Sequence, residues 1–409
     1  MAAFPTDGLP LYRADIGKPN MESTGLAAQE PDFILFRDDI ERMEMRFGAP
    51  IRLLTANTLP ELETLFAKAE IARREGHWLA GWFSYEAGAL FEPKLAASLS
   101  EGRRIPLAML GVFSPPAFDP IANAPQRRDE PALTAPRADW SQKDYSSRFN
   151  ILHGHLARGD CYQANLTFPV RARWQGEPMA IFDDLSARQP VKHAAFINLG
   201  ETKILSRSPE LFFRVSRDGW IESLPMKGTA KRGATKKLDA AQIRFLKTDP
   251  KNQAENRMIV DLLRNDISRI SEVGTLSVPK LFDVETYSTL HQMVSLVRAK
   301  LLPELALRDI FQALFPCGSI TGAPKLSAMT ILQKLEQKPR GIYCGAIGWI
   351  APDGAMSFNV AIRTLTLFPE GEAVFNVGGG VVFDSTAESE YAECLLKARF
   401  ALGSQTISS

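Results

Sequence analysis

Lys227 is the side chain best suited to act as a nucleophile, because it stands between a proline-methionine pair and a Gly-Thr pair. Strand-like segments flank Asp218-Gly219, which is a strong signal for a hairpin. A two-residue turn there would place Lys227 opposite Glu210, with Cβ atoms roughly 4.5–5.5 Å apart. The pair would then be either an ion pair on a solvated sheet face or a nucleophile beside a carboxylic acid.

Three glutamates could bind a hard cation. Glu255 lies in an expected helix over residues 239–269, on the same face as apolar residues. A carboxylate there is costly unless it is paired with a basic side chain or bound to a cation. Glu390 and Glu393 project together from the last expected helix, and with Glu255 they would offer the oxygen ligands that Mg²⁺ prefers. The alternatives are an ion pair for Glu255 and a solvated helix face for the other two.

Arg363 could clamp a carboxylate. It lies in an expected three-strand meander near the C-terminus, in one row with Tyr343 and the glycine run Gly378-Gly379-Gly380. A guanidinium group binds a carboxylate through two parallel hydrogen bonds, and glycines let the ligand approach the backbone. The alternative is that Arg363 pairs with an internal acid and the glycines mark a bulge. The expected strands are residues 343–350, 356–367 and 373–383, with turns at Asp353-Gly354 and Glu370-Gly371.

The loop 315–325, which contains Thr321 and Lys325, leads into an expected helix over residues 326–336. It superficially resembles a phosphate loop, but its glycine and lysine spacing is wrong, so a nucleoside-triphosphate site is excluded. A loop before a helix N-terminus can still hold a carboxylate. His291 lies in an expected strand, where a single histidine is more often structural than catalytic.

The elements that must position these side chains fall into two parts. Residues 1–113 contain an expected helix over 59–75 and several short strands, and 114–140 is a proline-rich, irregular connector. The main body, residues 141–409, carries all the candidate residues. Gly228 and Thr229, which follow Lys227, could contact a ligand through backbone and hydroxyl.

Composition narrows the class of protein. The chain has 409 residues, 48 basic and 47 acidic side chains, and a net charge of +1, so it has no electrostatic footprint for nucleic acid or an anionic membrane. Its four cysteines form no Cys-x-x-Cys pair. We see no signal peptide and no membrane-spanning stretch, and therefore expect a soluble, cytoplasmic protein.

Taken together, these motifs resemble the chorismate-utilising enzymes, the family that includes anthranilate, aminodeoxychorismate and isochorismate synthases. The resemblance covers roughly residues 145–400 and is highly specific as a set. The matching stretches are Ser208–Glu210, Pro225–Thr229, Ala254–Asp266, Gly318–Lys325, Tyr343–Gly348 and Gly378–Glu393.

The resemblance implies an α+β fold of two large packed antiparallel sheets with helices outside and the active site between them. It implies that Mg²⁺ is held by Glu255 and Glu393, with Glu390 close by, and that His291 lies near the reacting centre. Thr321 belongs to a matching stretch and is a further candidate contact. The resemblance implies these other substrate contacts: Gly228, Thr229, Lys325, Tyr343, Arg363, Gly378, Gly379 and Gly380.

Two positions distinguish the branches of this family. Anthranilate and isochorismate synthases carry alanine where this chain has Lys227, and isochorismate-forming members place a water-activating lysine where it has Gln163. Both differences favour formation of 4-amino-4-deoxychorismate, a precursor of p-aminobenzoate and folate. An anthranilate synthase large subunit is the alternative, and a non-catalytic chorismate-binding or glutaminase-regulating homologue is a candidate of another class. Several members have an acid in place of Asn252, which puts a third protein carboxylate on the metal in doubt.

The family mechanism implies that Lys227 adds to ring C2 while the C4 hydroxyl leaves, and that ammonia then adds at C4 and expels the lysine. A free lysine has a pKa of about 10.4, yet only the neutral amine can attack. An ionised Glu210 would keep it charged, so we predict that Glu210 is a protonated acid that helps the hydroxyl leave. No cysteine has the neighbours of a glutaminase nucleophile elbow. The chain is thus expected to use free ammonia or ammonia from a separate glutamine amidotransferase subunit.

Overall fold

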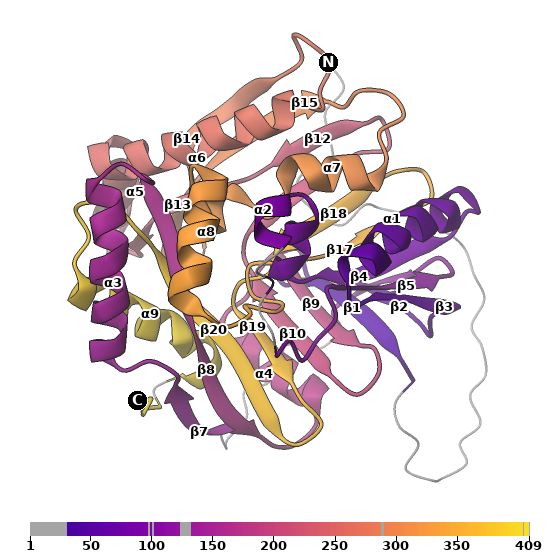
Figure 1. Cartoon of the computed structure of the whole chain (residues 1–409), viewed down its shortest axis with the longest axis horizontal. Helices are drawn as coiled ribbons and strands as arrows, with labels where there is room; N and C mark the ends of the chain where they lie inside the picture. The colour runs from indigo at the N-terminus through magenta and orange to yellow at the C-terminus, as the bar shows by residue number, and fades with distance from the viewer. Residues whose placement is uncertain are drawn as a thin grey trace.

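The computed structural model describes residues 31–96, 99, 102–122, 132–287, 290–403 and 405–408, which form two antiparallel sheets with helices outside them (Figure 1). The first sheet contains, in spatial order, β16 (Gly322–Ala323), β8 (Gln163–Trp174), β20 (Glu372–Val381), β19 (Thr364–Leu367), β10 (Lys203–Ser208), β9 (His193–Asn198), β1 (Phe33–Asp38), β2 (Met43–Phe47) and β6 (Ala117–Pro120), with β7 (Leu133–Ala138) paired to β8. The second contains β13 (Met226–Lys231), β15 (Leu290–Lys300), β12 (Trp220–Ser223), β11 (Leu211–Val215), β18 (Met356–Val360), β17 (Ala346–Ile350), β4 (Trp78–Phe83), β5 (Ala108–Phe113) and β3 (Arg52–Ala56), with β14 (Ser277–Thr286) paired to β15.

The helices connect these strands and cover the sheets. The α-helices are α1 (Leu59–Arg74), α2 (Pro93–Ala96), α3 (Gln142–Ala157), α4 (Pro178–Arg188), α5 (Lys236–Thr248), α6 (Pro250–Ser268), α7 (Leu307–Leu314), α8 (Lys325–Glu336) and α9 (Ala387–Leu402), and the 3₁₀ helices are η1 (Tyr85–Leu90) and η2 (Gly318–Ile320). In Figure 1, α3 and α9 lie on one side of the molecule and α1 lies on the opposite side. Within the part of the chain that the structure describes, no helix is long and apolar enough to cross a membrane.

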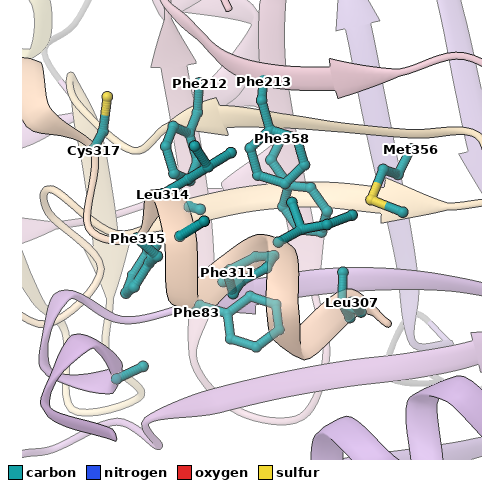
Figure 2. Packing of buried hydrophobic residues seen from close by; sticks show 14 of the residues in the cluster. Phe83, Phe212, Phe213, Leu307, Phe311, Leu314, Phe315, Cys317, Met356 and Phe358 are labelled. Carbon is teal, nitrogen blue, oxygen red and sulfur yellow. The ribbon is translucent and has the colours of Figure 1, made fainter. Parts of the chain in front are cut away.

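Three hydrophobic clusters account for this layering. One lies between the two sheets and joins Ile34 of β1 to Trp349 of β17. A second packs α3, α4, α8 and α9 against the first sheet, and a third packs α1, α6 and α7 against the second. Figure 2 shows part of the third cluster, where Phe311 of α7 packs against Phe83 with ring centroids 4.3 Å apart. The predicted α+β fold of two packed antiparallel sheets with helices outside is therefore confirmed.

Two of the places where the chain passes from one sheet to the other are neighbours. Strand β10 of the first sheet continues into β11 of the second through Pro209-Glu210, and β18 of the second continues into β19 of the first through residues 361–363. The amide of Arg207 donates to the carbonyl of Arg363 (2.9 Å), so the two crossings lie side by side. Arg363 has a φ of +51°, in the left-handed region, where the strand bends out of its sheet. The expected three-strand meander is therefore wrong, because its middle strand is two strands in different sheets.

The first hairpin differs from its predicted register by one residue. Arg214 pairs with Glu222, because the loop has three residues and Gly219 takes a φ of +74° at its last position. The strand that carries Lys227, β13, then pairs with β15 instead of β11. The predicted cross-strand pairing of Lys227 with Glu210 is therefore wrong.

The expected helix over residues 239–269 is two helices, α5 and α6. Pro250 has no N–H to donate and restricts the residue before it, so Asp249 is extended with a ψ of 120°. The Asp249 side chain then accepts a hydrogen bond from the amide of Asn252 and caps α6. By contrast, the expected helix over residues 59–75 is confirmed as α1, with its apolar residues buried on one face.

The N-terminal strands are hydrogen-bonded to strands of the main body. β1 pairs with β9, and β4 pairs with β17. The stretch expected to be an irregular connector contains β6 and β7, and residues 123–131 of it lie outside the described residues. The division into residues 1–113, 114–140 and 141–409 stays a prediction.

Candidate active site

Ser319 brings Lys227 and Glu210 together. The Ser319 hydroxyl donates to Oε1 of Glu210 at 2.8 Å, and the Lys227 ammonium donates to the Ser319 carbonyl at 3.4 Å. Glu210 lies at one of the crossings between the sheets, Ser319 lies in η2, and Lys227 lies near the start of β13. Although the predicted register is wrong, the two predicted reactive side chains therefore meet through a third residue.

Glu210 is almost fully buried, with 6% of its surface exposed. Burial raises the pKa of its carboxyl group above the usual value. The positive charge of Lys227, the hydrogen bond from Ser319 and the charge of Arg363 act in the opposite direction, but burial outweighs them. The surroundings therefore favour the neutral acid, the form that can donate a proton.

Arg363 lies at the second crossing, and its guanidinium is close enough to Glu210 for their charges to interact. Burial lowers the pKa of this guanidinium. No hydrogen bond or ion pair joins it to any residue that the structure describes. A largely buried guanidinium with free donors would gain from a carboxylate ligand, which can accept two parallel hydrogen bonds.

Tyr343 lies just before β17, and the next residue, Cys344, donates its amide to the carbonyl of Ala361 near Arg363 (2.9 Å). The tyrosine is 8% exposed, and burial raises the pKa of its hydroxyl well above the usual value. This hydroxyl makes no hydrogen bond within the described residues. Tyr343 is thus a neutral side chain whose hydroxyl is free to bind a ligand.

The glycine run Gly378–Gly380 lies in β20, opposite residues 165–167 of β8. A Cβ at position 379 would lie 2.8 Å from Oε2 of Glu390, and one at position 380 would lie 2.5 Å from Nε2 of Gln163. The glycines thus leave room for these polar side chains to lie against the strand.

Two of the predicted metal ligands lie on α9, beside this glycine run. Ser385 donates to Glu390 at 2.7 Å; burial raises the pKa of the Glu390 carboxyl, and the negative charge of Glu393 raises it further. The Glu393 side chain is 52% exposed and forms an ion pair with Lys397 at 2.8 Å. A bound cation would relieve the repulsion between the carboxylates of Glu390 and Glu393, so these two residues fit a hard-cation site.

Glu255 lies half-buried on α6 and makes no hydrogen bond or ion pair with a described residue. Lys251, one turn before it, is close enough to act on the charge of Glu390, so α6 approaches α9. In the described ranges, however, no three His, Cys, Asp or Glu side chains are grouped closely enough to hold a metal ion. The magnesium site stays a prediction.

Three predicted substrate contacts have partners inside the protein. Lys325 donates to Asp266 at 2.9 Å and to the carbonyl of Leu314 at 3.1 Å, which fastens α8 to α6 and α7. The Thr321 hydroxyl donates to the carbonyl of Cys317 at 3.2 Å. Thr229 donates to Gln292 at 2.8 Å on the exposed side of β13. Their contacts with substrate stay predictions.

Gly228, next to Lys227, has a φ of +85°. A Cβ there would lie 2.9 Å from Oδ1 of Asn252, on the first turn of α6. Glycine is therefore required by both conformation and space, and Asn252 borders the segment that carries Lys227.

His291 is fully buried and has both ring nitrogens engaged. Nδ1 lies 2.9 Å from the Thr286 hydroxyl, and Nε2 lies 2.8 Å from Oδ1 of Asp239, at the start of α5. Hydrogen bonds from Arg232, above all, lower the pKa of Asp239, so this acid is ionised and can accept the proton on Nε2. These bonds fasten α5 to β15, and the place of His291 near the reacting centre stays a prediction.

Sequence reasoning missed Ser319 and Lys397 as site residues. Ser319 was part of a matching stretch, but no pattern indicated that its two polar groups would face Glu210 and Lys227. Lys397 donates to the carbonyl of Gly378 at 2.8 Å and to Glu393. Its position four residues after Glu393 on a helix is the signal that could have found it.

A cavity of about 400 Å³ lies elsewhere in the molecule. It is lined by the β11–β12 turn, residues 300–307 and the β17–β18 turn, and it contains none of the candidate residues. The site above is therefore identified by its chemistry and not by the size of this cavity.

Comparison with known proteins identifies the same family that the sequence motifs resemble. The model of a family described as chorismate binding enzyme matches residues 26–403. A Klebsiella aerogenes protein named aminodeoxychorismate synthase component 1 is 43% identical over 257 residues, which are 63% of this chain but only 56% of that protein. A Schizosaccharomyces pombe protein named probable anthranilate synthase component 1 is 31% identical over 86% of this chain and 82% of its own length. The solved structure of anthranilate synthase component I from Streptococcus pneumoniae TIGR4 has a TM-score of 0.76 and 23% identity, covering 93% of this chain and 94% of that one.

Proposed function

Because the chain belongs to the chorismate binding enzyme family, we propose that it is the synthase component that converts chorismate and ammonia to 4-amino-4-deoxychorismate. The observation that supports this most directly is the linkage of Lys227 to Glu210 through Ser319. A lysine and a buried acid that are bridged by one residue can act on the same substrate ring. Relatives named aminodeoxychorismate synthase also support this branch, although the chain spans only about half the length of the first of them.

The proposed reaction has two covalent steps. The neutral amine of Lys227 adds to ring C2, the two ring double bonds shift, and the C4 hydroxyl leaves as water with the proton that Glu210 donates. The new C–N bond leaves a proton on the lysine nitrogen, and this proton returns to the Glu210 carboxylate. Ammonia then adds at C4, the two double bonds shift back, and the C2–N bond breaks; the proton lost by the incoming nitrogen leaves with Lys227. Two easier displacements thus replace one difficult displacement.

Arg363 and Tyr343 are proposed to hold a carboxylate of chorismate. The support is that Tyr343 is buried and Arg363 largely so, and that the hydroxyl and the guanidinium have no partner among the described residues. The backbone of Gly378–Gly380 would approach the same ligand. Lys325 is a weaker candidate, because Asp266 and a carbonyl already engage its ammonium group.

Magnesium is proposed as the cofactor, held by Glu255 and Glu393 with Glu390 nearby. When bound, it would neutralise a substrate carboxylate. The support is the concentration of acidic side chains that α9 presents beside the glycine run. Mg²⁺ takes oxygen ligands and keeps several of them from substrate and water, so a few protein carboxylates suffice.

Ammonia is proposed to come from a separate glutamine amidotransferase subunit. All four cysteines are buried, and burial raises the pKa of each thiol, so none resembles the activated nucleophile of a glutaminase. The term "component 1" in the name of the Klebsiella relative fits a two-subunit enzyme. With excess ammonium salt, this chain should work without that partner.

A product assay tests the proposal. We expect incubation with chorismate, Mg²⁺ and ammonium salt to yield 4-amino-4-deoxychorismate, which gives p-aminobenzoate only after a lyase is added. Direct appearance of 2-aminobenzoate would overturn the proposal in favour of anthranilate synthase, the name of the Schizosaccharomyces pombe relative. Chorismate binding without turnover at saturating ammonium would indicate a non-catalytic homologue.

A further inference from the structure

Behind the candidate site, Arg340 forms a buried two-bonded ion pair with Glu336. Its Nε donates to Oε2 and one terminal nitrogen donates to Oε1, both at 2.8 Å, and the two side chains are 2% and 7% exposed. The guanidinium also reaches two other segments. Nη1 donates to the carbonyl of Ile320 at 3.2 Å, and Nη2, which donates to Oε1 of Glu336, also donates to the carbonyl of Asn165 at 2.8 Å. One guanidinium therefore joins the end of α8, strand β8 and η2.

The network continues on both sides of this ion pair. Glu336 also accepts from the amide and hydroxyl of Thr167, at 3.0 and 3.1 Å. Glu86 of η1 accepts from the amides of Arg340 and Gly341, and burial raises its pKa to about 7. A buried charged network with every group bonded holds a single geometry, whereas breaking one member leaves an unpaired buried charge.

The turn that this network reaches also carries Ser319. Arg340 holds the Ile320 carbonyl on one side of η2, while Phe315 anchors the chain before η2 in an aromatic cluster with Phe311 (Figure 2). Between these two attachments, Ser319 directs its hydroxyl to Glu210 and its carbonyl to Lys227. The orientation of η2 therefore decides whether both hydrogen bonds can form together.

We propose that Arg340 is a positioning residue for the reaction: by holding η2 through the Ile320 carbonyl, it sets Ser319 between Glu210 and Lys227. Arg340 itself contacts neither reactive side chain. The inference rests on the proposed function and extends it, since it assigns the alignment of the acid and the nucleophile to a residue one layer behind them.

Arg340→Lys is the main test, because lysine keeps the charge but not the planar fork. We expect kcat to fall by about 10²-fold, the cost of displacing a catalytic group by about 1 Å, while KM for chorismate changes little. Arg340→Ala should recover part of its kcat when guanidinium ions are added at low concentration, since the missing group is then supplied in solution.

A second readout does not depend on turnover. The infrared band of the protonated Glu210 carboxyl, assigned as the band lost in Glu210→Gln, reports its titration. The hydrogen bond from Ser319 stabilises the ionised form, so its loss in Arg340→Lys should raise the pKa of Glu210 further. The charged and titratable groups that face Glu210 are Lys227, Arg363 and Cys317, and none of them is changed in this variant.

Arg188→Lys is the matched control. Arg188 likewise pairs with an acid one helical turn away, Asp184 (2.6 Å), and donates to a backbone carbonyl, that of Ala401 (3.0 Å). It joins α4 to the end of α9 and does not reach η2. It should lose thermal stability as Arg340→Lys does, but keep wild-type kcat and the wild-type titration of Glu210.

The proposal is overturned if Arg340→Lys resembles this control, with lower stability but an unchanged kcat and an unchanged Glu210 titration. If Arg340→Lys does not fold, Glu336→Gln takes its place, and an unchanged Glu210 titration there overturns the proposal equally. If the wild-type chain forms a different product, the proposed function fails, whereas the infrared titration still decides the role of Arg340.

Discussion

At the scale of single residues, the site depends on Glu210 being neutral while a lysine and an arginine lie near it. Burial favours the protonated carboxyl, and three favourable interactions with the ionised form are too weak to reverse this effect. A neutral acid can protonate a leaving hydroxyl and does not hold the neighbouring lysine in its charged form. Ser319 hydrogen-bonds to this acid through its hydroxyl and to Lys227 through its carbonyl, so one residue bridges the two side chains.

The covalent role of Lys227 can be tested by mass spectrometry. With chorismate and Mg²⁺ but no ammonia, the intact protein should gain the mass of a dehydrated chorismate, and peptide mapping should locate the adduct at position 227. Lys227→Ala should form no adduct and should lose kcat on the order of 10⁴-fold, as other enzymes do when they lose their nucleophile.

Lys231→Ala, in the same strand but exposed, serves as the control and should keep the adduct. If only unmodified protein is seen under conditions that support turnover once ammonia is added, the covalent route does not operate in this chain.

At the scale of elements, three hairpins share one feature. Gly219, Gly354 and Gly371 all have positive φ angles of +74° to +90° and occupy the last place of a three-residue loop. Each of the three registers therefore differs by one residue from a two-residue turn. Hairpins with three-residue loops commonly place a glycine in the left-handed region at the last loop position. Asp-Gly and Glu-Gly pairs occur in both two-residue and three-residue loops, so they do not distinguish the two loop lengths.

The adjacent crossings of the chain between the sheets are the other element-scale feature. Glu210 lies in one and Arg363 lies in the other, and the chain bends at Arg363 because its φ is positive. A side chain within a strand that faces the space between the sheets must pack against the opposite sheet. A side chain at such a bend can face this space without that packing. The crossings therefore place a buried carboxyl group and a largely buried guanidinium near each other.

Gly379→Ala tests the link between the glycine run and the acids of α9. The added Cβ would lie 2.8 Å from Oε2 of Glu390, at the end of a flexible side chain, so we expect the protein to fold and Glu390 to move. The displaced acid should weaken the proposed metal site, and the Mg²⁺ concentration for half-maximal activity should rise about tenfold or more.

Gly48→Ala is the control for this variant, because a Cβ there meets nothing within 4 Å. A Gly379→Ala protein with a normal Mg²⁺ requirement would contradict the placement of the cation beside β20.

At the scale of the whole molecule, the core joins segments that are distant in sequence. Phe83, Phe213, Phe311 and Phe358 come from β4, β11, α7 and β18, and the centroids of their contacting rings lie 4.3–6.1 Å apart (Figure 2). This cluster lies on the outer face of the second sheet, beneath α7, and the same segment continues into η2. The stability of the core and the position of Ser319 are therefore coupled through one helix.

Phe311→Ala should lower the free energy of unfolding by about 3–5 kcal/mol, because it removes a buried ring at the centre of this cluster. Denaturant unfolding followed by tryptophan fluorescence and by circular dichroism measures the change. The two signals should report a single transition, since strands as distant in sequence as β3 and β18 share this core.

Phe245→Ala, on the exposed side of α5, should change the same quantity by less than about 0.5 kcal/mol. An equally small effect for Phe311→Ala would show that the cluster does not carry the stability that its burial indicates.

Much of the local structure was predictable. The apolar spacing of residues 59–75 predicts α1, the Asp-Gly and Glu-Gly pairs predict where strands reverse, and the motifs around Lys227, Glu255 and Gly378 indicate where chemistry resides. These signals are predictable because hydrophobic periodicity and turn conformation depend on residues within about one helical turn of each other.

The sequence by itself determined which residue types could react and which short segments become helices and turns. Only the tertiary structure decided that β13 pairs with β15, that β18 and β19 lie in different sheets, and that Ser319 meets Glu210 across 109 positions of the chain. The physical reason is that a strand's partners are selected by burial and hydrogen bonding over long separations, which neighbouring residues do not encode. The candidate pair Lys227 and Glu210 was therefore visible in the sequence, whereas Ser319, which joins the two, was not.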